Sequence, residues 1–111
     1  MKRHLLFLAA LLIVNLAASA QKKFSVYAVG FYNQENLFDT CHDEGKKDYE
    51  YLPNKGWNGM KYTNKLRNMS KALADMGTDV LPKVGCAFIG LFEVENHKVL
   101  DALVDKAPLK A

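Results

Sequence analysis

The sequence predicts an α/β fold in which a strand, a helix, a second strand and a second helix follow one another. Two apolar runs of strand length, residues 24–33 and 86–94, indicate buried strands. The segment between them has the three- and four-residue spacing of an amphipathic helix, and the same spacing returns over residues 95–107. Alternating strands and helices are typical of folds built on a parallel sheet.

The first 20 residues precede this pattern and are predicted to be a secretory signal peptide. Lys2 and Arg3 come before an apolar stretch that ends in the small residues "ASA" at 18–20. Asn15 interrupts the stretch, which is shorter than the roughly 20 apolar residues of a membrane span. We therefore expect cleavage near Ala20, export to the periplasm or the extracellular space, and no stable membrane association. A retained membrane anchor is the alternative.

Residues 21–111 then form a chain long enough to hold one small core. Loss of Lys2 and Arg3 lowers the formal net charge from +3 to +1, so bulk charge does not predict nucleic-acid binding. Cys41 and Cys86 allow a single disulfide. Cys86 also opens an apolar run in which a free thiol packs as a small hydrophobic group, so both states stay open.

The first expected strand, "FSVYAVGFYN" at 24–33, is almost continuously apolar, which suits a strand covered on both faces. A long loop of mixed charge follows over residues 39–57. Loops of this length in compact domains tend to be functional, but the charges are equally consistent with a solvated surface. A turn formed locally is the expected role of Asp39.

The expected middle helix covers about residues 59–76 and ends at Gly77, a residue type typical of the position after a helix. Its apolar stripe is expected in the core and its basic residues on the wet side; the stripe comprises Tyr62, Leu66, Met69, Leu73 and Met76, and the basic residues are Lys61, Lys65, Arg67 and Lys71. After the second strand, Asn96 is expected to cap the last helix, which leaves Glu95 outside the site unless the strand is longer.

Polar residues stand where both strands are expected to end. Two strands joined by a crossover helix are normally parallel neighbours, so their carboxyl ends meet at one edge of the sheet, where ligands bind. Asn33 and Glu35 lie at the end of the first strand and Glu93 at the end of the second. On an extended backbone Asn33 and Glu35 point to one face and Gln34 to the other. Two carboxylates and an amide oxygen are ligands that Mg²⁺ accepts, although strand-end polar residues often simply meet solvent.

"YNQENLFD" at 32–39 and "IGLFEVEN" at 89–96 together resemble the opening of the endonuclease/exonuclease/phosphatase family. These are metal-dependent phosphoesterases similar to deoxyribonuclease I, and the resemblance is strongest to the exported bacterial members. It implies that Glu93 is the principal Mg²⁺ ligand, that Glu35 and Asn33 are further ligands, and that Glu93 and Asn33 are catalytic. Mn²⁺ is an alternative ion. Phe92 departs from the pattern, because the family often has Gln or Ser at this position. A phenylalanine cannot make the hydrogen bond near the metal that those side chains could make.

The resemblance also implies two sheets packed face to face with helices outside, of which this chain matches the amino-terminal third, with an incomplete sheet. The family's later catalytic segments, an Asp and Asn pair and then an Asp and a His, have no counterpart here. His42 and His97 are expected to be exposed polar residues that do not replace them.

We therefore expect the amino-terminal fragment of an exported Mg²⁺-dependent phosphoesterase, inactive by itself. In the complete enzyme it would act as an endonuclease on the phosphodiester bonds of nucleic acid, or on another phosphate ester. A shortened product without catalysis and a small exported binding or interaction module are the alternatives.

Overall fold

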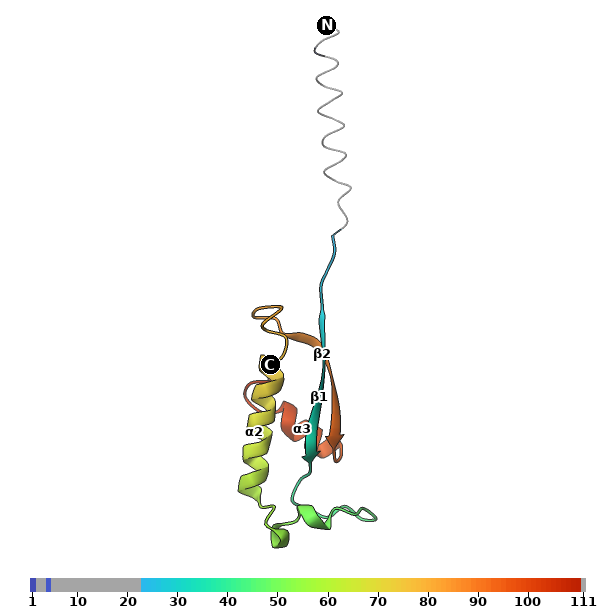
Figure 1. The fold of residues 1–111 in the computed structure, drawn as a ribbon, viewed down its shortest axis with the longest axis vertical. Helices are drawn as coiled ribbons and strands as arrows, with labels where there is room; N and C mark the ends of the chain where they lie inside the picture. Colours follow the sequence, from blue (N-terminus) through green and yellow to red (C-terminus); the bar gives the residue numbers. More distant parts are fainter. Residues whose placement is uncertain (2–3, 5–22, 111) are drawn as a thin grey trace.

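The computed structural model describes residues 1, 4 and 23–110, so the predicted signal peptide at 1–20 lies almost wholly outside the described residues. The described elements, in chain order, are β1 (Ala28–Leu37), the 3₁₀ turns η1 (Tyr49–Tyr51) and η2 (Pro53–Lys55), α2 (Gly59–Asp75), β2 (Cys86–Val94) and α3 (His97–Val104). This order confirms the predicted α/β succession of strand, helix, strand and helix (Figure 1). No helix in the described part of the chain is long and apolar enough to cross a membrane.

β1 and β2 form a two-stranded parallel sheet, as the right-handed crossover argument predicts. Ala28 pairs with Cys86 at one end and Leu37 with Val94 at the other. The carboxyl ends of the two strands therefore lie at the same edge. The predicted bounds of the first strand were wrong, because residues 24–27 are not in the strand and β1 continues past Asn33.

Both helices begin at an asparagine cap. The side chain of Asn58 accepts a hydrogen bond from the Lys61 N–H at 3.0 Å, and the side chain of Asn96 accepts one from the Val99 N–H at 3.0 Å. The cap at Asn96 confirms the sequence prediction, and only two residues separate the end of β2 from the start of α3. α2 ends before Gly77, which has the left-handed φ of 77° expected there.

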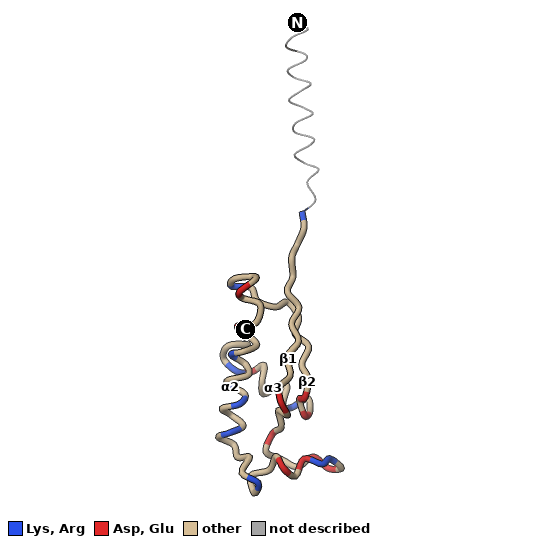
Figure 2. Tube along the Cα trace, in the orientation of Figure 1, with Lys and Arg blue, Asp and Glu red and all other residues tan. Residues whose placement is uncertain are grey.

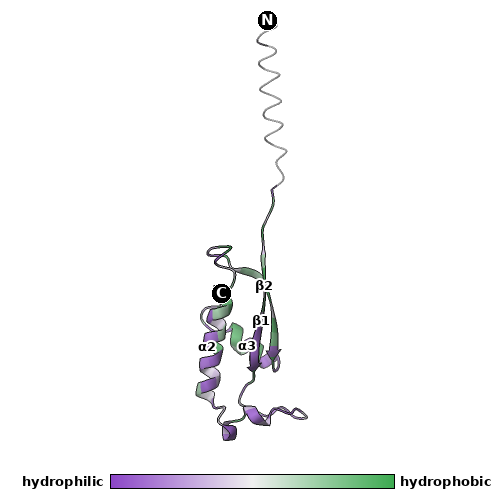
Figure 3. Cartoon of the chain, viewed as in Figure 1, coloured by the Kyte–Doolittle hydropathy of each residue, from purple (hydrophilic) through white to green (hydrophobic). Residues whose placement is uncertain are grey.

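The core lies on one face of the sheet, where α2 and α3 pack. It comprises Leu37 from β1, Leu66 and Leu73 from α2, and Val99 and Leu103 from α3. The expectation that the first strand is covered on both faces was wrong for the described residues. The opposite face of the sheet is apolar but exposed, at 55–72% of each side chain; its members are Val29, Phe31, Phe88 and Phe92. β2 appears hydrophobic along most of its length in Figure 3.

The two cysteines are both free, which settles the alternative that the sequence left open. Cys41 is exposed in the loop after β1, whereas Cys86 is half-buried at the start of β2. They lie near opposite ends of the sheet, because Cys86 pairs with Ala28 and Cys41 follows the last β1 residue, Leu37.

Candidate functional site

β1 bulges at the edge of the sheet where the candidate residues gather. Asn33 pairs with Phe92 and Leu37 with Val94, so β1 advances four residues while β2 advances two. The extra residues include Glu35 and Asn36. Bulges of this kind redirect side chains and are frequent beside active sites.

The backbone at this edge is strained. Glu35, Asn36 and Glu93 have left-handed φ values of 51°, 57° and 57°. For residues other than glycine this conformation costs about 1–2 kcal/mol each, although asparagine tolerates it better. The burial pattern agrees with the predicted alternation over Asn33, Gln34 and Glu35, which are exposed, fully buried and exposed in turn, and the alternation ends at Asn36, which is exposed as well. Strain of this kind clusters at ligand and catalytic sites.

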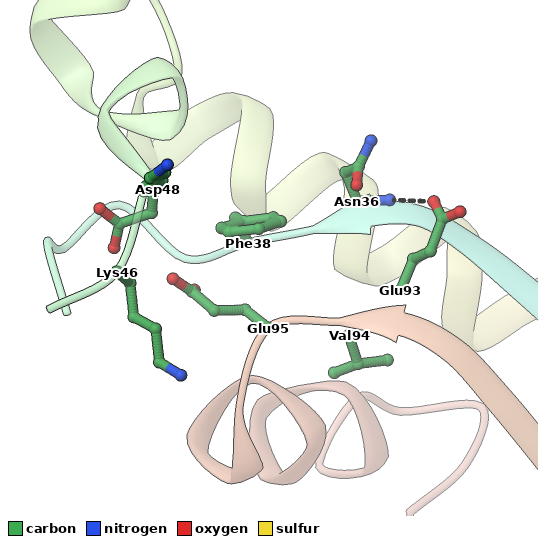
Figure 4. Close-up of a pocket in the computed structure, with 8 residues that line it drawn as sticks. Asn36, Phe38, Lys46, Asp48, Glu93, Val94 and Glu95 are labelled. Carbon is green, nitrogen blue, oxygen red and sulfur yellow. Dashed lines mark hydrogen bonds between the residues drawn. The ribbon is translucent and has the colours of Figure 1, made fainter.

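Glu93 is held at this edge by two hydrogen bonds from β1. Its Oε1 accepts from the Asn33 Nδ2 at 2.9 Å. Its Oε2 accepts from the Asn36 N–H at 3.0 Å, the bond that is dashed in Figure 4. The Oδ1 of Asn33 in turn accepts from the Glu35 N–H at 2.7 Å. The structure thus brings Asn33 and Glu93 into direct contact and links Glu35 to them through its backbone. Glu93 remains exposed, and each of its oxygens keeps lone-pair capacity for another partner.

Lys65 of α2 also reaches the bulge, a contact that the sequence reasoning missed by placing this lysine on the wet side. Its Nζ donates to the carbonyl oxygen of Glu35 and, at 3.3 Å, to that of Asn36. Partial burial lowers the pKa of Lys65 below its usual value, while the charges of Glu35 and Glu93 act in the opposite direction. Both carboxylates therefore act on the ammonium group through their charge, but among the described residues neither forms an ion pair with it. In the sequence, Lys65 stands next to Leu66 at the border of the apolar stripe of α2, and this position was the available signal that the lysine reaches the sheet.

Trp57 fixes the chain where it leaves β1, and this role was also not anticipated. Its Nε1 donates to the carbonyl oxygens of Phe38, at 3.0 Å, and Asp39, at 2.9 Å. The Oδ1 of Asp39 accepts from the Cys41 N–H at 2.6 Å, which is the local turn role expected for this residue. The segment after the bulge is therefore held by two kinds of hydrogen bond: one within the segment itself, and those from the indole of Trp57, just before α2.

Glu95 lies apart from the Glu93 cluster, the name used here for Glu93, Asn33 and Glu35. β2 ends at Val94, and the carboxylate of Glu95 points away from Glu93 toward Asp48 in Figure 4. Its Oε2 accepts from the Asp39 N–H at 2.9 Å, whereas its Oε1 is buried without a hydrogen-bond partner. Burial, together with the negative charges of Asp39, Asp43 and Asp48, raises the pKa of Glu95 above its usual value.

The loop at 39–57 is organised around a buried carboxylate. Asp48 is only 1% exposed; its Oδ1 bonds the Nδ1 of His42 at 2.5 Å and its Oδ2 accepts from the Asp43 N–H at 2.7 Å. The Oδ2 of Asp43 accepts from the Nδ2 of Asn96 at 2.9 Å, which ties the loop to the start of α3. His42 is exposed as expected, and it also bonds Asp48, a contact that the sequence reasoning did not anticipate. His97 is exposed as expected.

A pocket of about 290 Å³ lies between this loop and the carboxyl ends of both strands. Figure 4 shows Lys46 on the loop side and Glu93 on the strand side. The pocket is lined by Asn36, Phe38, Lys46, Lys47, Asp48, Glu93, Val94 and Glu95. Acidic and basic residues alternate along the loop segment, whereas α2 carries mostly basic ones (Figure 2).

The donor chemistry of the Glu93 cluster fits a hard divalent cation. Glu93 and Glu35 are exposed carboxylates at the edge of the sheet, and Asn33 adds an amide oxygen. Within residues 1, 4 and 23–110, no group of three or more His, Cys, Asp or Glu side chains is arranged to hold a metal ion. The described residues therefore offer two carboxylates and one amide, and a fuller ligand set needs water, substrate or further groups.

Together, these features define an α/β protein with an oxygen-rich site at the carboxyl edge of parallel strands, where such folds bind their ligands. The family model described as the endonuclease/exonuclease/phosphatase family matches residues 28–111, and the chain belongs to this family. Membership supports a metal-dependent function of the phosphoesterase or nuclease kind, with phosphodiesters such as nucleic acids as substrates. No curated protein and no solved structure gives a significant match to the chain.

Proposed function

We propose that this chain carries the amino-terminal part of the metal site of an exported, Mg²⁺-dependent phosphodiesterase of the deoxyribonuclease I type, acting as an endonuclease. Family membership supports the general class. The observation that carries the finer proposal is the placement of Glu93, an exposed carboxylate that Asn33 and Asn36 orient at the edge of the sheet. Residues 1–20 would export the chain, which supports action outside the cytoplasm.

Glu93 is the proposed principal ligand of Mg²⁺, or of Mn²⁺, and Glu35 is the second carboxylate. When bound, the ion would polarise the phosphate and neutralise charge that develops during cleavage. Glu93 retains free lone pairs on both oxygens, so it can bind a cation without losing the two hydrogen bonds that hold it.

Asn33 has a positioning role in this geometry. Its amide nitrogen donates to Glu93 and its oxygen accepts from the Glu35 N–H, so both ends of the amide are engaged. Asn33 keeps the Glu93 carboxylate facing the bulge. It can become a direct ligand by presenting the second lone pair of Oδ1, which a hydrogen bond to one N–H leaves free.

Lys65 places a positive charge beside the proposed site before a cation binds. Its ammonium group bonds the carbonyl oxygens of Glu35 and Asn36 and lies in the field of Glu35 and Glu93. A positive charge in the field of carboxylates lowers the free energy of the folded state. A bound Mg²⁺ would add to this effect and should stabilise the folded chain.

The test is the thermal stability of the chain in EDTA and in Mg²⁺. With a weak Kd of about 3 mM, an Mg²⁺ concentration of about 10 mM stabilises the folded state by about 0.9 kcal/mol, which raises Tm by roughly 4–7 °C. Glu93→Gln should remove most of this rise. Glu50→Gln, in the η1 turn, is the matched control and should leave the rise unchanged. No rise with Mg²⁺, or an equal rise in Glu93→Gln, would refute the metal site.

The same samples should show no hydrolysis of plasmid DNA or a chromogenic diester above background. The described residues place no histidine base at the site, since His42 bonds Asp48 and His97 is exposed on α3. Turnover that Glu93→Gln abolishes would show a more complete active site than this proposal allows.

A further inference from the structure

We propose that Lys65 of α2 is a positioning residue of this site: its ammonium group clamps the bulge of β1 and so fixes the N–H group that orients Glu93. The inference rests on the proposed function, because Glu93 is the principal metal ligand there. The clamp differs from an effect of charge alone, since it acts through hydrogen bonds to backbone oxygens.

The bulge needs partners from outside the sheet. Residues 34–36, which precede the pair formed by Leu37, have no partner residue in β2. Glu35 and Asn36 also have left-handed φ values, a conformation that persists only where the surrounding structure holds it. Backbone polar groups that leave the ladder of a sheet are satisfied by side chains or water. Lys65 supplies such a partner, because its Nζ donates to the carbonyl oxygens of both Glu35 and Asn36.

One peptide group connects Lys65 to Glu93. The carbonyl oxygen of Glu35 and the N–H of Asn36 belong to the same peptide group, and in a trans peptide such as this one they point in opposite directions. Lys65 donates to the carbonyl oxygen, and the Oε2 of Glu93 accepts from the N–H at 3.0 Å (Figure 4). The cation and the carboxylate therefore hold the plane of this peptide group from its two sides. Loss of the Lys65 contact leaves the plane free to rotate, and the N–H then turns away from Glu93.

The helix holds the Lys65 side chain in place. Leu66, the next residue, is 2% exposed and belongs to the core, so this turn of α2 is fixed against the sheet. The centroid of the Trp57 ring lies 5.8 Å from the Lys65 Nζ, within the range of a cation–π contact. The indole N–H of Trp57 donates to the carbonyl oxygens of Phe38 and Asp39. Trp57 and Lys65 therefore hold the bulge and the residues that follow it.

The alternative is that Lys65 acts only through its charge. Among the described residues Lys65 forms no ion pair, and its donors are turned to backbone carbonyl oxygens. The two explanations predict opposite results for metal binding. A positive charge repels a nearby cation, so if charge were the only effect, removal of Lys65 would tighten Mg²⁺ binding. Removal of a clamp would weaken Mg²⁺ binding, because Glu93 would lose its orientation.

The experiment uses the full chain, isotope-labelled for NMR, and three variants. Lys65→Met removes the ammonium group but keeps an unbranched side chain. The matched control is Lys61→Met, which removes the same charge from an exposed residue one helical turn earlier on α2. Lys65→Arg keeps the charge and the hydrogen-bond donors. Circular dichroism checks that each variant is folded.

The first measurement is the exchange of backbone N–H groups with water in EDTA, which requires no metal. In Lys65→Met we expect the Asn36 N–H to exchange about tenfold faster, because its peptide group is no longer held on the carbonyl side. The Asp43 N–H, which donates to Asp48 in the loop beside this edge, should change by less than about twofold. Lys61→Met and Lys65→Arg should leave both rates within about threefold of the unmodified chain. Unchanged exchange at Asn36 in Lys65→Met would refute the clamp.

The second measurement is the Mg²⁺ affinity, taken from the shifts of the same N–H signals during a titration. We expect Lys65→Met to bind Mg²⁺ about tenfold more weakly, which is typical for the loss of a group that orients a metal ligand. Lys61→Met and Lys65→Arg should keep the affinity within about threefold. Tighter or unchanged binding in Lys65→Met would overturn the positioning role, and so would a loss in Lys65→Arg as large as in Lys65→Met.

The two measurements separate this inference from the proposed function. If the unmodified chain binds no Mg²⁺ but the Asn36 N–H exchanges faster in Lys65→Met, the metal site is refuted and the clamp on Glu93 stands. If the unmodified chain binds Mg²⁺ and the exchange rate at Asn36 does not change in Lys65→Met, the proposed function stands and this inference fails.

Discussion

Substitution of Asn33 tests whether its amide orients Glu93, and two variants separate hydrogen bonding from charge. Asn33→Ala removes the donor to Glu93 Oε1 and the acceptor of the Glu35 N–H. Asn33→Asp keeps an acceptor for Glu35 but places a second carboxylate against Glu93. The two variants should therefore both destabilise the chain in EDTA, with the larger effect in Asn33→Asp.

The magnitudes follow from the geometry. The lost bonds are 2.9 Å and 2.7 Å long, but both groups are exposed and water replaces part of each, so Asn33→Ala should cost about 1 kcal/mol. For a domain of this size that corresponds to a decrease in Tm of roughly 4–8 °C. In Asn33→Asp, the Coulomb repulsion of two exposed charges about 4 Å apart adds about 1 kcal/mol, for a total of about 2 kcal/mol.

The assay is thermal unfolding followed by circular dichroism at pH 7, in EDTA and in Mg²⁺. Asn33→Asp should gain more from Mg²⁺ than the unmodified chain, because a cation relieves the added repulsion. Asn33→Ala should gain less, since Glu93 is no longer oriented. A change in Tm below about 1 °C for Asn33→Ala, or a smaller Mg²⁺ gain in Asn33→Asp than in Asn33→Ala, would refute the reasoning.

Two further predictions concern the segments that support the site. Trp57→Phe removes the donor to the carbonyl oxygens of Phe38 and Asp39 and should lower the free energy of unfolding by about 1–2 kcal/mol in urea titrations; no change would show that water replaces the indole N–H without cost. Asp48 has a pKa below its usual value, chiefly because the Asp43 N–H donates to it, with a further contribution from His42. The ionised Asp48 therefore stabilises the folded state above its unfolded-state pKa, and this stabilisation is lost as the pH falls through the folded-state pKa. As the pH is lowered from about 5 to 3, the Tm of Asp48→Asn should decrease less steeply than the Tm of the unmodified chain. Parallel curves for the two chains would contradict this.

The sequence predicted the fold class because hydrophobic periodicity reports which residues are buried. The apolar runs located both strands, the stripe through Leu66 and Leu73 located α2, and Asn96 located the start of α3. The parallel pairing followed from chain order alone and was confirmed.

The details of the site were predicted less well, because they depend on contacts between distant segments. The contact between Asn33 and Glu93 could be anticipated from the shared edge of the sheet. The bulge could not, since nothing in "NQEN" specifies that Glu35 and Asn36 leave the regular strand. Lys65 and Trp57 were missed because their partners are backbone carbonyl oxygens, which carry no sequence signal.

The left-handed backbone at Glu93 has a consequence for protein engineering. Glycine adopts this φ without the penalty that glutamate incurs, but at Glu93 the change would also remove two hydrogen bonds. At Glu35 only the backbone takes part in hydrogen bonds, so a library selected only for folding should accumulate glycine there first and lose one carboxylate of the site. A stability-guided redesign of this chain would therefore erase its site first, and these two positions should be fixed before any optimisation begins.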